Sequence, residues 1–148
     1  MKNSYLVTTL EELDSFAQQM TSTLIKELSA QQGATIVTLN GDLGSGKTTL
    51  SQMIGKHLGV TEPIASPTFV ISKYYDLQNQ SWTRLIHIDA YRLEGQNLTP
   101  MNFPELFTDS NNILLIEWPE YMSAVLPKQH TAISIVHNKD DSRQIDID

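Results

Sequence analysis

The chain has 148 residues, of which 40% are hydrophobic and 18% are charged, and its formal net charge is −7. It contains no cysteine, which excludes disulfide bonds, a cysteine nucleophile and cysteine-ligated zinc or iron–sulfur sites. This length predicts one domain over residues 1–148. The sequence shows neither a signal peptide nor the roughly 18 apolar residues of a membrane span, so we expect a cytoplasmic protein. Its acidic balance disfavours broad binding to a nucleic-acid backbone.

The N-terminal part predicts a helix, a strand and a second helix. Thr9 and Glu12 have the spacing at which a hydroxyl and a carboxylate cap a helix start. Apolar residues then recur at three- and four-residue steps, which predicts an amphipathic helix that ends near Gly33. Residues 34–40 are rich in β-branched side chains and predict a strand, and a glycine-rich turn leads from it to a helix over residues 47–58.

The rest of the chain predicts strands and little helix. The predicted strands cover residues 69–75, 82–89, 113–116, 131–137 and 143–147. The first two form an antiparallel pair, the last two form a closing hairpin, and the wholly apolar third is typical of a strand buried on both faces. Residues 94–104 predict a loop, with a short helix over residues 104–107. This order of elements predicts an α/β fold with a mixed sheet.

The strongest motif is the run Gly-Asp-Leu-Gly-Ser-Gly-Lys-Thr at residues 41–48. It satisfies the P-loop pattern in full and lies between a predicted strand and a predicted helix. Its glycines allow positive φ and bring main-chain N–H groups close to phosphate oxygens. We therefore expect Lys47 to reach the terminal phosphates and Thr48 to ligate Mg²⁺, in a single-domain three-layer sandwich of the P-loop NTPase kind.

Two carboxylates are candidates for the magnesium side of such a site. Asp89 and Glu117 each stand at the end of an apolar predicted strand. Acidic residues at the C-terminal ends of buried strands commonly lie near the metal of P-loop enzymes. One would hold the water shell of the metal and the other would orient the attacking water, and the residues alone leave open which does which. Thr68, in a Ser-Pro-Thr-Phe loop, either senses the γ-phosphate or caps a proline-fixed turn.

Three alternatives to an ATPase are open. Residues 138–141 fit the Asn-Lys-x-Asp pattern that recognises guanine in small GTPases. No Asp-x-x-Gly follows a candidate metal-binding strand, so we interpret this segment as a polar hairpin turn. A small-molecule kinase is disfavoured because no arginine-rich lid is present, the only arginines being Arg84, Arg92 and Arg143. The third alternative is a nucleotide-binding interaction protein without hydrolysis.

The histidines and tryptophans receive weaker assignments. The four histidines have no metal-ligand spacing, so we interpret them as packing residues. Trp82 is interpreted as core or hairpin packing. Trp118 directly follows Glu117, which places it at the mouth of the expected site, and a functional role and a packing role are equally open for it.

Four motifs together resemble the bacterial TsaE (YjeE) family. They are Gly-Asp-Leu-Gly-Ser-Gly-Lys-Thr-Thr at 41–49, Ser-Pro-Thr-Phe at 66–69, His-Ile-Asp-Ala-Tyr-Arg-Leu at 87–93 and Leu-Ile-Glu-Trp-Pro at 115–119. The resemblance covers nearly the whole chain. It implies a small MgATP-dependent P-loop ATPase that is required for the threonylcarbamoyladenosine modification of tRNA. It further implies that this ATPase is nearly idle alone, works on the TsaB–TsaD protein complex, and meets tRNA only through that complex.

The resemblance also implies roles for individual residues. The catalytic residues that it implies are Lys47, Thr68, Asp89, Glu117 and Trp118. The magnesium ligands that it implies are Thr48, Asp89 and Glu117. The residues implied to bind ATP or ADP are Thr9, Leu10, Asp42, Leu43, Gly44, Ser45, Gly46, Lys47, Thr48, Thr49 and Arg143. Of these, Arg143 is expected near the adenine, with Thr9 and Leu10 flanking the base.

Overall fold

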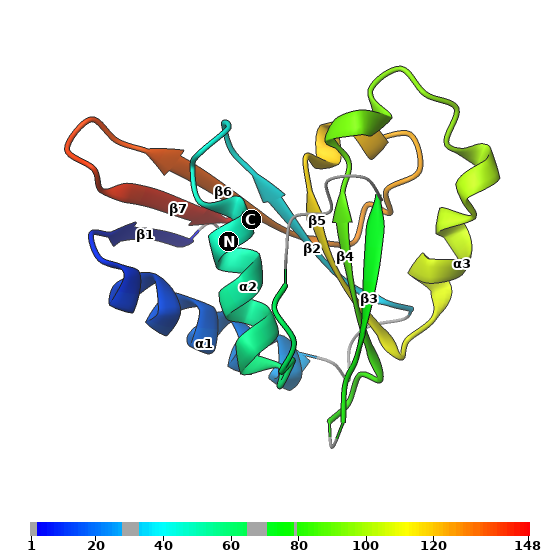
Figure 1. The fold of residues 1–148 in the computed structure, drawn as a ribbon, viewed down its shortest axis with the longest axis horizontal. Coiled ribbons are helices and arrows are strands. Elements are labelled where there is room, and N and C mark those ends of the chain that lie inside the picture. Colours follow the sequence, from blue (N-terminus) through cyan, green and yellow to red (C-terminus); the bar gives the residue numbers. More distant parts are fainter. Residues whose placement is uncertain (1–2, 28–32, 65–70, 79) are drawn as a thin grey trace.

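The computed structural model describes residues 3–27, 33–64, 71–78 and 80–148, which form an α/β structure in layers (Figure 1). A seven-stranded sheet with the order β1-β7-β6-β2-β5-β4-β3 runs through it. Its strands are β1 (Asn3–Val7), β2 (Thr35–Asn40), β3 (Ser72–Asp76), β4 (Arg84–Asp89), β5 (Asn112–Glu117), β6 (Thr131–His137) and β7 (Arg143–Ile147). The α-helices are α1 (Leu10–Glu27), α2 (Lys47–His57) and α3 (Phe103–Thr108), and short 3₁₀ turns are η2 (Tyr91–Leu93), η3 (Thr99–Met101) and η4 (Pro119–Met122).

The sheet is mixed, as predicted. Strands β6, β2, β5 and β4 are parallel, whereas β3, β7 and β1 each join a neighbour in antiparallel pairing. Leu39 on β2 is in register with Glu117 on β5, and Glu117 is in register with Asp89 on β4. The C-terminal ends of these three strands therefore meet at one edge of the sheet, which is where ligands bind in open parallel sheets.

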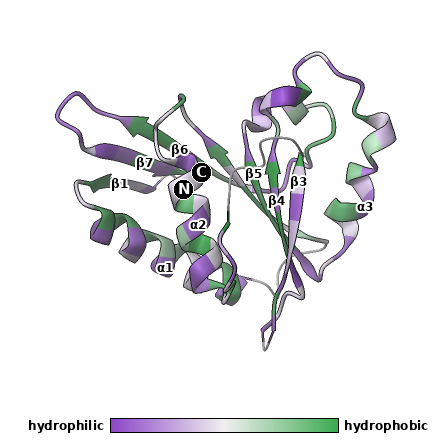
Figure 2. Ribbon diagram, viewed as in Figure 1, coloured by the Kyte–Doolittle hydropathy of each residue, from purple (hydrophilic) through white to green (hydrophobic). Residues whose placement is uncertain are grey.

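Helices cover both faces of the sheet, which gives the predicted three layers. Helices α1 and α2 lie on one face, and α3 with the 3₁₀ turns lies on the other (Figure 1). The central strands are mostly hydrophobic, whereas the helices carry hydrophilic residues on their outer sides (Figure 2). Strand β5 is buried along its whole length, which confirms the prediction from its apolar run.

Helix α1 begins at the predicted cap. The Oγ1 of Thr9 accepts a hydrogen bond from the N–H of Glu12 at 3.1 Å. The Glu12 carboxylate accepts its return bond from the N–H of Thr8 at 2.7 Å, one residue earlier than in a standard capping box. The predicted helix end near Gly33 follows residues 28–32, which lie outside the described residues.

The later elements agree with most of the prediction and extend it. Helix α2, the strand pair β3–β4 and the hairpin β6–β7 lie where they were expected, with the start of the strand predicted over residues 69–75 falling partly outside the described residues. The predicted loop over residues 94–104 contains the turn η3, and the short helix predicted over residues 104–107 begins earlier, at Phe103. The buried Phe103 and Phe107 rings stack at 6.2 Å and fix this helix to the sheet.

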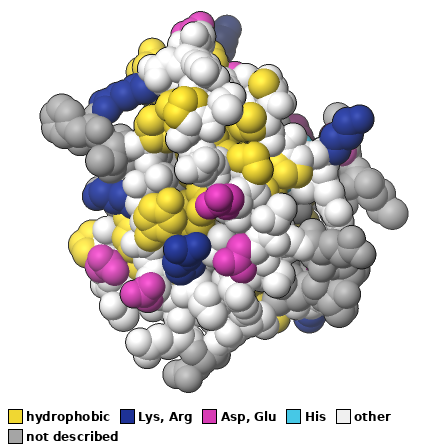
Figure 3. Space-filling view, turned by 90° about the vertical axis from the view of Figure 1, so that its right-hand side faces the viewer, with side chains coloured by type: hydrophobic (Ala, Val, Ile, Leu, Met, Phe, Trp, Pro, Cys, Tyr) yellow, Lys and Arg dark blue, Asp and Glu magenta, His cyan; other side chains and the backbone are white. Residues whose placement is uncertain are grey.

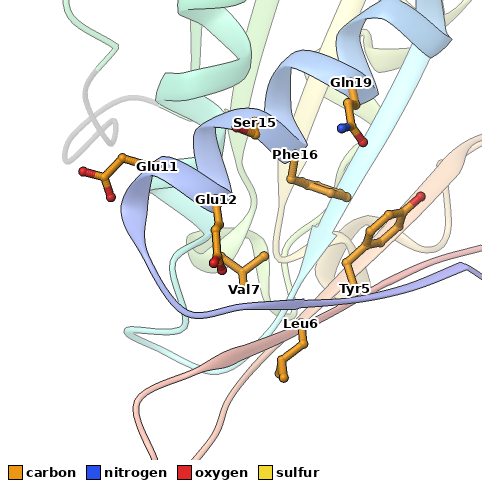
Figure 4. A pocket seen from close by; sticks show the side chains of 8 residues that line it. All are labelled: Tyr5, Leu6, Val7, Glu11, Glu12, Ser15, Phe16 and Gln19. Atoms are coloured by element: carbon orange, nitrogen blue, oxygen red, sulfur yellow. The ribbon is translucent and has the colours of Figure 1, made fainter.

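Strand β1 was missed by the sequence analysis. It pairs with β7 from Asn3↔Ile147 to Val7↔Arg143, so it forms the outermost strand on that side of the sheet. Figure 4 shows Tyr5 turned toward Phe16 of α1, with their ring centroids 5.1 Å apart, and Leu6 turned to the opposite side of the strand. A hollow of about 350 Å³ lies between β1 and α1 and contains these residues.

The face opposite α1 and α2 is covered by short elements only. Figure 3 shows hydrophobic side chains gathered on this side of the molecule, among scattered charged ones.

Among the residues that the structure describes, no helix combines the length and the apolar character needed to cross a membrane.

Candidate functional site

The glycine-rich loop after β2 is held in a conformation that requires glycine. Gly46 has φ +112°, and a Cβ there would lie 3.4 Å from the Nε of Arg143. Gly41 has φ +157°, and a Cβ there would lie 2.6 Å from the carbonyl oxygen of Ile135. L-residues rarely adopt positive φ, so these two positions account for part of the sequence pattern. Helix α2 starts at Lys47, directly after the loop, and directs its positive dipole end to this point.

The ammonium group of Lys47 lies inside this loop. Its Nζ donates to the carbonyl oxygens of Gly41, at 2.6 Å, and Asp42, at 3.0 Å. It also lies 4.1 Å from the centre of the Trp118 ring. The residue is only 5% exposed, and this burial lowers the pKa of Lys47, an effect that the nearby Glu117 carboxylate opposes. The loop thus contains a desolvated cation next to a helix N-terminus, which is an environment suited to an anion.

Thr48 and Glu117 form a direct contact beside the lysine. The hydroxyl of Thr48 donates to Oε1 of Glu117 at 2.9 Å, and Glu117 is only 2% exposed. Asp89 lines the same hollow, and its Oδ1 accepts from the N–H of Tyr91 at 3.1 Å. Among the described residues, no group of three or more acidic or histidine side chains could hold a metal ion on its own. A hydroxyl and one or two carboxylates are the donor set with which proteins hold Mg²⁺ when phosphates complete the shell, so these residues fit that ion.

These side chains open into a hollow of about 280 Å³ at the C-terminal edge of the sheet. It is lined by Leu43, Gly44, Gly46, Lys47, Thr48, Thr49, Asp89, Glu117, Trp118 and Arg143. A second hollow of about 270 Å³ is lined by Val7, Thr8, Thr9, Leu10, Leu13, Gly46, Thr49, Asp141 and Arg143. Three residues line both hollows, so the two are neighbours, and the second lies between the start of α1 and the β6–β7 hairpin.

Arg143 connects the last strand to the glycine-rich loop. Its Nε donates to the carbonyl oxygen of Ser45 at 3.0 Å, and its Nη1 donates to the carbonyl oxygen of Asp141 at 3.4 Å. Arg143 starts β7 and pairs with His137, the last residue of β6, which runs parallel to β2 and β5, so Arg143 stands at the same edge of the sheet as Glu117. The guanidinium group therefore lies at the boundary between the two hollows.

Trp118 forms one wall of the first hollow. It has a left-handed backbone, with φ +58°, immediately before η4. Its ring lies 5.1 Å from that of Tyr91 and 6.2 Å from that of Tyr121. This aromatic group covers the buried Lys47, so the tryptophan lies at the mouth of the site as the sequence analysis expected.

The predicted site residues come together with few exceptions. Of those described, Asp42 and Ser45 are the two that line neither hollow, although their main-chain carbonyls bind Lys47 and Arg143. Thr68 lies outside the described residues, so its role stays a prediction.

The guanine-recognition pattern at residues 138–141 forms a hairpin turn, as interpreted from the sequence. The N–H of Asn138 donates to the carbonyl of Ser142 at 2.8 Å, and its side-chain amide donates to the Ser142 hydroxyl at 3.0 Å. Oδ1 of Asp141 contacts Nε2 of His137 at 2.6 Å. The side chains that would read a guanine base are therefore engaged within the turn itself.

Sequence reasoning missed one polar residue of the site. His87 was interpreted as a packing residue, but its Nε2 lies 2.5 Å from Oε2 of Glu117, and the ring is fully buried. The available signal was strand alternation, because His87 and Asp89 are two residues apart on β4 and share a face.

Comparison with known proteins places this geometry in a family. Residues 7–145 match the family model described as "Threonylcarbamoyl adenosine biosynthesis protein TsaE". A relative from Nostoc sp., named tRNA threonylcarbamoyladenosine biosynthesis protein TsaE, is 38% identical over 76% of this chain and 68% of its own length. A relative of the same name from Bacillus subtilis is 36% identical over 74% of this chain and 66% of its own length. The crystal structure of YdiB from Bacillus subtilis matches with a TM-score of 0.72 and 27% identity, over 99% of this chain and 84% of that one. The chain thus spans about two thirds of the length of these two curated relatives.

Proposed function

The chain belongs to the TsaE family, which acts in the biosynthesis of threonylcarbamoyladenosine in tRNA, and on this premise we propose that it is a MgATP-binding, weakly hydrolysing ATPase. The observation that carries the proposal is the buried Lys47 ammonium inside the glycine-rich loop, adjacent to the Thr48–Glu117 contact. Together they combine a phosphate cradle with oxygen donors for a divalent cation at one edge of the sheet.

The loop and Lys47 bind the phosphates in this proposal. The main-chain N–H groups of the loop and the first turn of α2 donate to phosphate oxygens. Lys47 exchanges its contacts with the Gly41 and Asp42 carbonyls for the terminal phosphate oxygens. Because its ammonium is already desolvated, little further desolvation opposes that exchange.

Thr48 and Glu117 hold Mg²⁺ in this proposal, with Asp89 as the second carboxylate. The ion would supply neutralisation of the phosphate charge that develops during hydrolysis. Asp89, the other carboxylate, orients the water that attacks the γ-phosphate in line in this proposal.

The second hollow is proposed to hold the nucleoside. It is bordered by Thr9 and Leu10 on one side and by Arg143 on the other, and it adjoins the phosphate cradle at Gly46. Leu10 is 65% exposed and is therefore available to cover an apolar base face.

In this proposal the TsaB–TsaD complex activates ATP hydrolysis and connects the ATPase to tRNA. Among the described residues, Arg143 is the arginine that lines the hollows, and it is bound to the loop carbonyl of Ser45. A second cation is therefore needed to offset transition-state charge, and a partner protein supplies it or orders the Thr68 loop. The protein acts in the cytoplasm in this proposal and reaches tRNA through the partner complex.

Nucleotide titration with ATP, ADP and GTP, followed by turnover with and without the TsaB–TsaD complex, tests the proposed function. We expect adenine nucleotides to bind more tightly than GTP, and turnover to rise when the complex is added. Preference for GTP would favour the GTPase alternative. Transfer of phosphate to a small acceptor would favour a kinase, and tight ADP binding without turnover in the presence of partners would favour a binding protein.

The substitution Glu117→Ala tests the carboxylate role separately. We expect this variant to bind nucleotide and to hydrolyse it poorly, because the cradle stays intact while the metal side is lost. Near-normal hydrolysis by the variant would remove Glu117 from the mechanism.

A further inference from the structure

His87, which forms a buried pair with Glu117, has no part in the function described so far. Nε2 of His87 lies 2.5 Å from Oε2 of Glu117, and the side chains are 0% and 3% exposed. The pair arises from the register of two parallel strands. His87 is opposite Leu115 and Glu117 is opposite Asp89, so both side chains project on the same face of the sheet, two residues apart along it.

The chemistry of the two groups assigns the proton. An ionised carboxylate can only accept hydrogen bonds, so the Nε2 of His87 carries the hydrogen and donates it. Among the described residues, Nδ1 of the buried ring has no hydrogen-bond partner. Within the described residues, the contact with Glu117 is therefore the side-chain hydrogen bond of this ring.

The two oxygens of the Glu117 carboxylate are therefore held from two sides. Oε2 accepts from His87, and Oε1 accepts from the hydroxyl of Thr48 at 2.9 Å. A bound cation would draw on the oxygens of Thr48 and Glu117, whereas the contact from His87 lies on the other carboxylate oxygen. His87 thus contacts the carboxylate oxygen that does not contact Thr48.

We propose that His87 is a positioning residue that orients Glu117, so that Oε1 is presented at the Thr48 hydroxyl where the cation of a bound nucleotide is held. The inference rests on the proposed function of this site. Hydrogen bonds from outside the ligand shell fix the orientation of metal-binding side chains, and their removal typically lowers metal affinity or activity about 10- to 100-fold. Loss of His87 should therefore change the Mg²⁺ dependence of turnover and leave the affinity of the glycine-rich loop for nucleotide phosphates unchanged.

Two substitutions at His87 separate orientation from packing. His87→Leu removes the donor and keeps an apolar side chain, whereas His87→Gln can present an amide N–H near the former Nε2. His57→Leu is a matched control, since His57 also contacts a carboxylate through Nε2, that of Asp14 at 3.0 Å, and lines neither hollow of the site.

The first measurement is a Mg²⁺ titration at saturating ATP, combined with calorimetric ADP binding in EDTA. We expect His87→Leu to raise the Mg²⁺ concentration for half-maximal turnover about 10- to 100-fold, with ADP affinity in EDTA unchanged within about threefold. His87→Gln should recover most of the Mg²⁺ dependence, and His57→Leu should resemble the wild type. An unchanged Mg²⁺ dependence in His87→Leu, or an equal loss of ADP affinity in EDTA, would overturn the proposal.

A second measurement does not depend on turnover. Nitrogen-15 spectra of the histidine rings in the ligand-free protein should show hydrogen on Nε2 of His87, and this signal should shift in Glu117→Gln. A ring without hydrogen on Nε2 would overturn the proposal even if His87→Leu fails to fold.

A double variant tests whether His87 acts through Glu117. His87→Leu combined with Glu117→Gln should be no more impaired in Mg²⁺ dependence than Glu117→Gln alone, because the two losses share one cause. Additive losses would show that His87 acts by another route. Wild-type protein that binds no magnesium nucleotide would contradict the proposed function, whereas normal binding with an unaffected His87→Leu would contradict only the role of His87.

Discussion

The substitution Thr48→Val removes one hydroxyl group from the site and keeps the shape of the side chain. In the ligand-free protein this hydroxyl donates to the Oε1 of Glu117 at 2.9 Å, and Glu117 is only 2% exposed. The variant therefore leaves one oxygen of a buried carboxylate without this donor. Loss of a hydrogen bond to a charged group costs about 1.5–3 kcal/mol. We expect the free energy of unfolding to fall by that amount.

The prediction is measured by urea and thermal unfolding in EDTA without nucleotide. For a chain of this size each kcal/mol shifts the melting temperature by about 2–4 °C, so we expect a fall of about 3–12 °C. Thr48→Ser keeps the hydroxyl and should lose much less. Thr23→Val is a control, because Thr23 lies on an exposed turn of α1 and donates to the main-chain carbonyl of Gln19 on the same helix. Substitutions at such surface positions usually change stability by less than about 0.5 kcal/mol.

Two outcomes would refute this reasoning. If Thr48→Val is as stable as the wild type, the Thr48–Glu117 contact contributes nothing to the ligand-free site. If Thr48→Ser loses as much stability as Thr48→Val, the loss comes from packing in the first turn of α2 and not from the hydroxyl.

Two further predictions concern the elements that support the site. A Cβ at Gly55 on α2 would lie less than 3.0 Å from Cδ1 of Ile64, so Gly55→Ala should lower the free energy of unfolding by about 1–3 kcal/mol. Valine lacks that Cδ1 atom, so adding Ile64→Val to Gly55→Ala should recover most of the lost free energy of unfolding. Chemical unfolding checks both, and a failure of Ile64→Val to compensate would contradict the clash. The backbone N–H and hydroxyl of Thr8 lower the pKa of Glu12, so its contribution to stability should be present above about pH 4.3 and lost as the pH falls through the lowered value. The stability advantage of the wild type over Glu12→Gln should shrink from pH 7 to pH 3, and an advantage that grows toward acid pH would contradict it.

Much of the fold could be predicted because its signals are local. The β-branched run of β2, the apolar run of β5 and the capping residue Thr9 each indicate their element within a few residues. Strand β1 has no such signal, because its five residues Asn-Ser-Tyr-Leu-Val show no polar–apolar alternation and form a strand through their pairing with β7. The turns η2 and η4 follow strands β4 and β5 and are likewise set by tertiary contacts.

The candidate site likewise contains residues that the local sequence predicts and residues that only strand pairing brings in. The loop around Lys47 could be predicted because its glycines, lysine and threonine are contiguous in sequence and each has a chemical reason to be there. Arg143 enters the site only through the pairing of β7, so composition and spacing alone do not indicate it, and it was reached through a family resemblance. The contact of His87 with Glu117 was not predicted, because it depends on the register of two strands that are separated along the chain by a loop and α3.

The most direct test of the whole account is calorimetric titration of ADP into Lys47→Ala, with Lys56→Ala as the matched control. Lys56 is on the same helix, but its side chain is 68% exposed and lines neither hollow of the site. Loss of charge-assisted hydrogen bonds worth about 1.5–3 kcal/mol predicts about 10- to 150-fold weaker binding for Lys47→Ala and unchanged binding for Lys56→Ala. Equal affinity for ADP in the wild type and Lys47→Ala would contradict the assignment of the glycine-rich loop as the phosphate site.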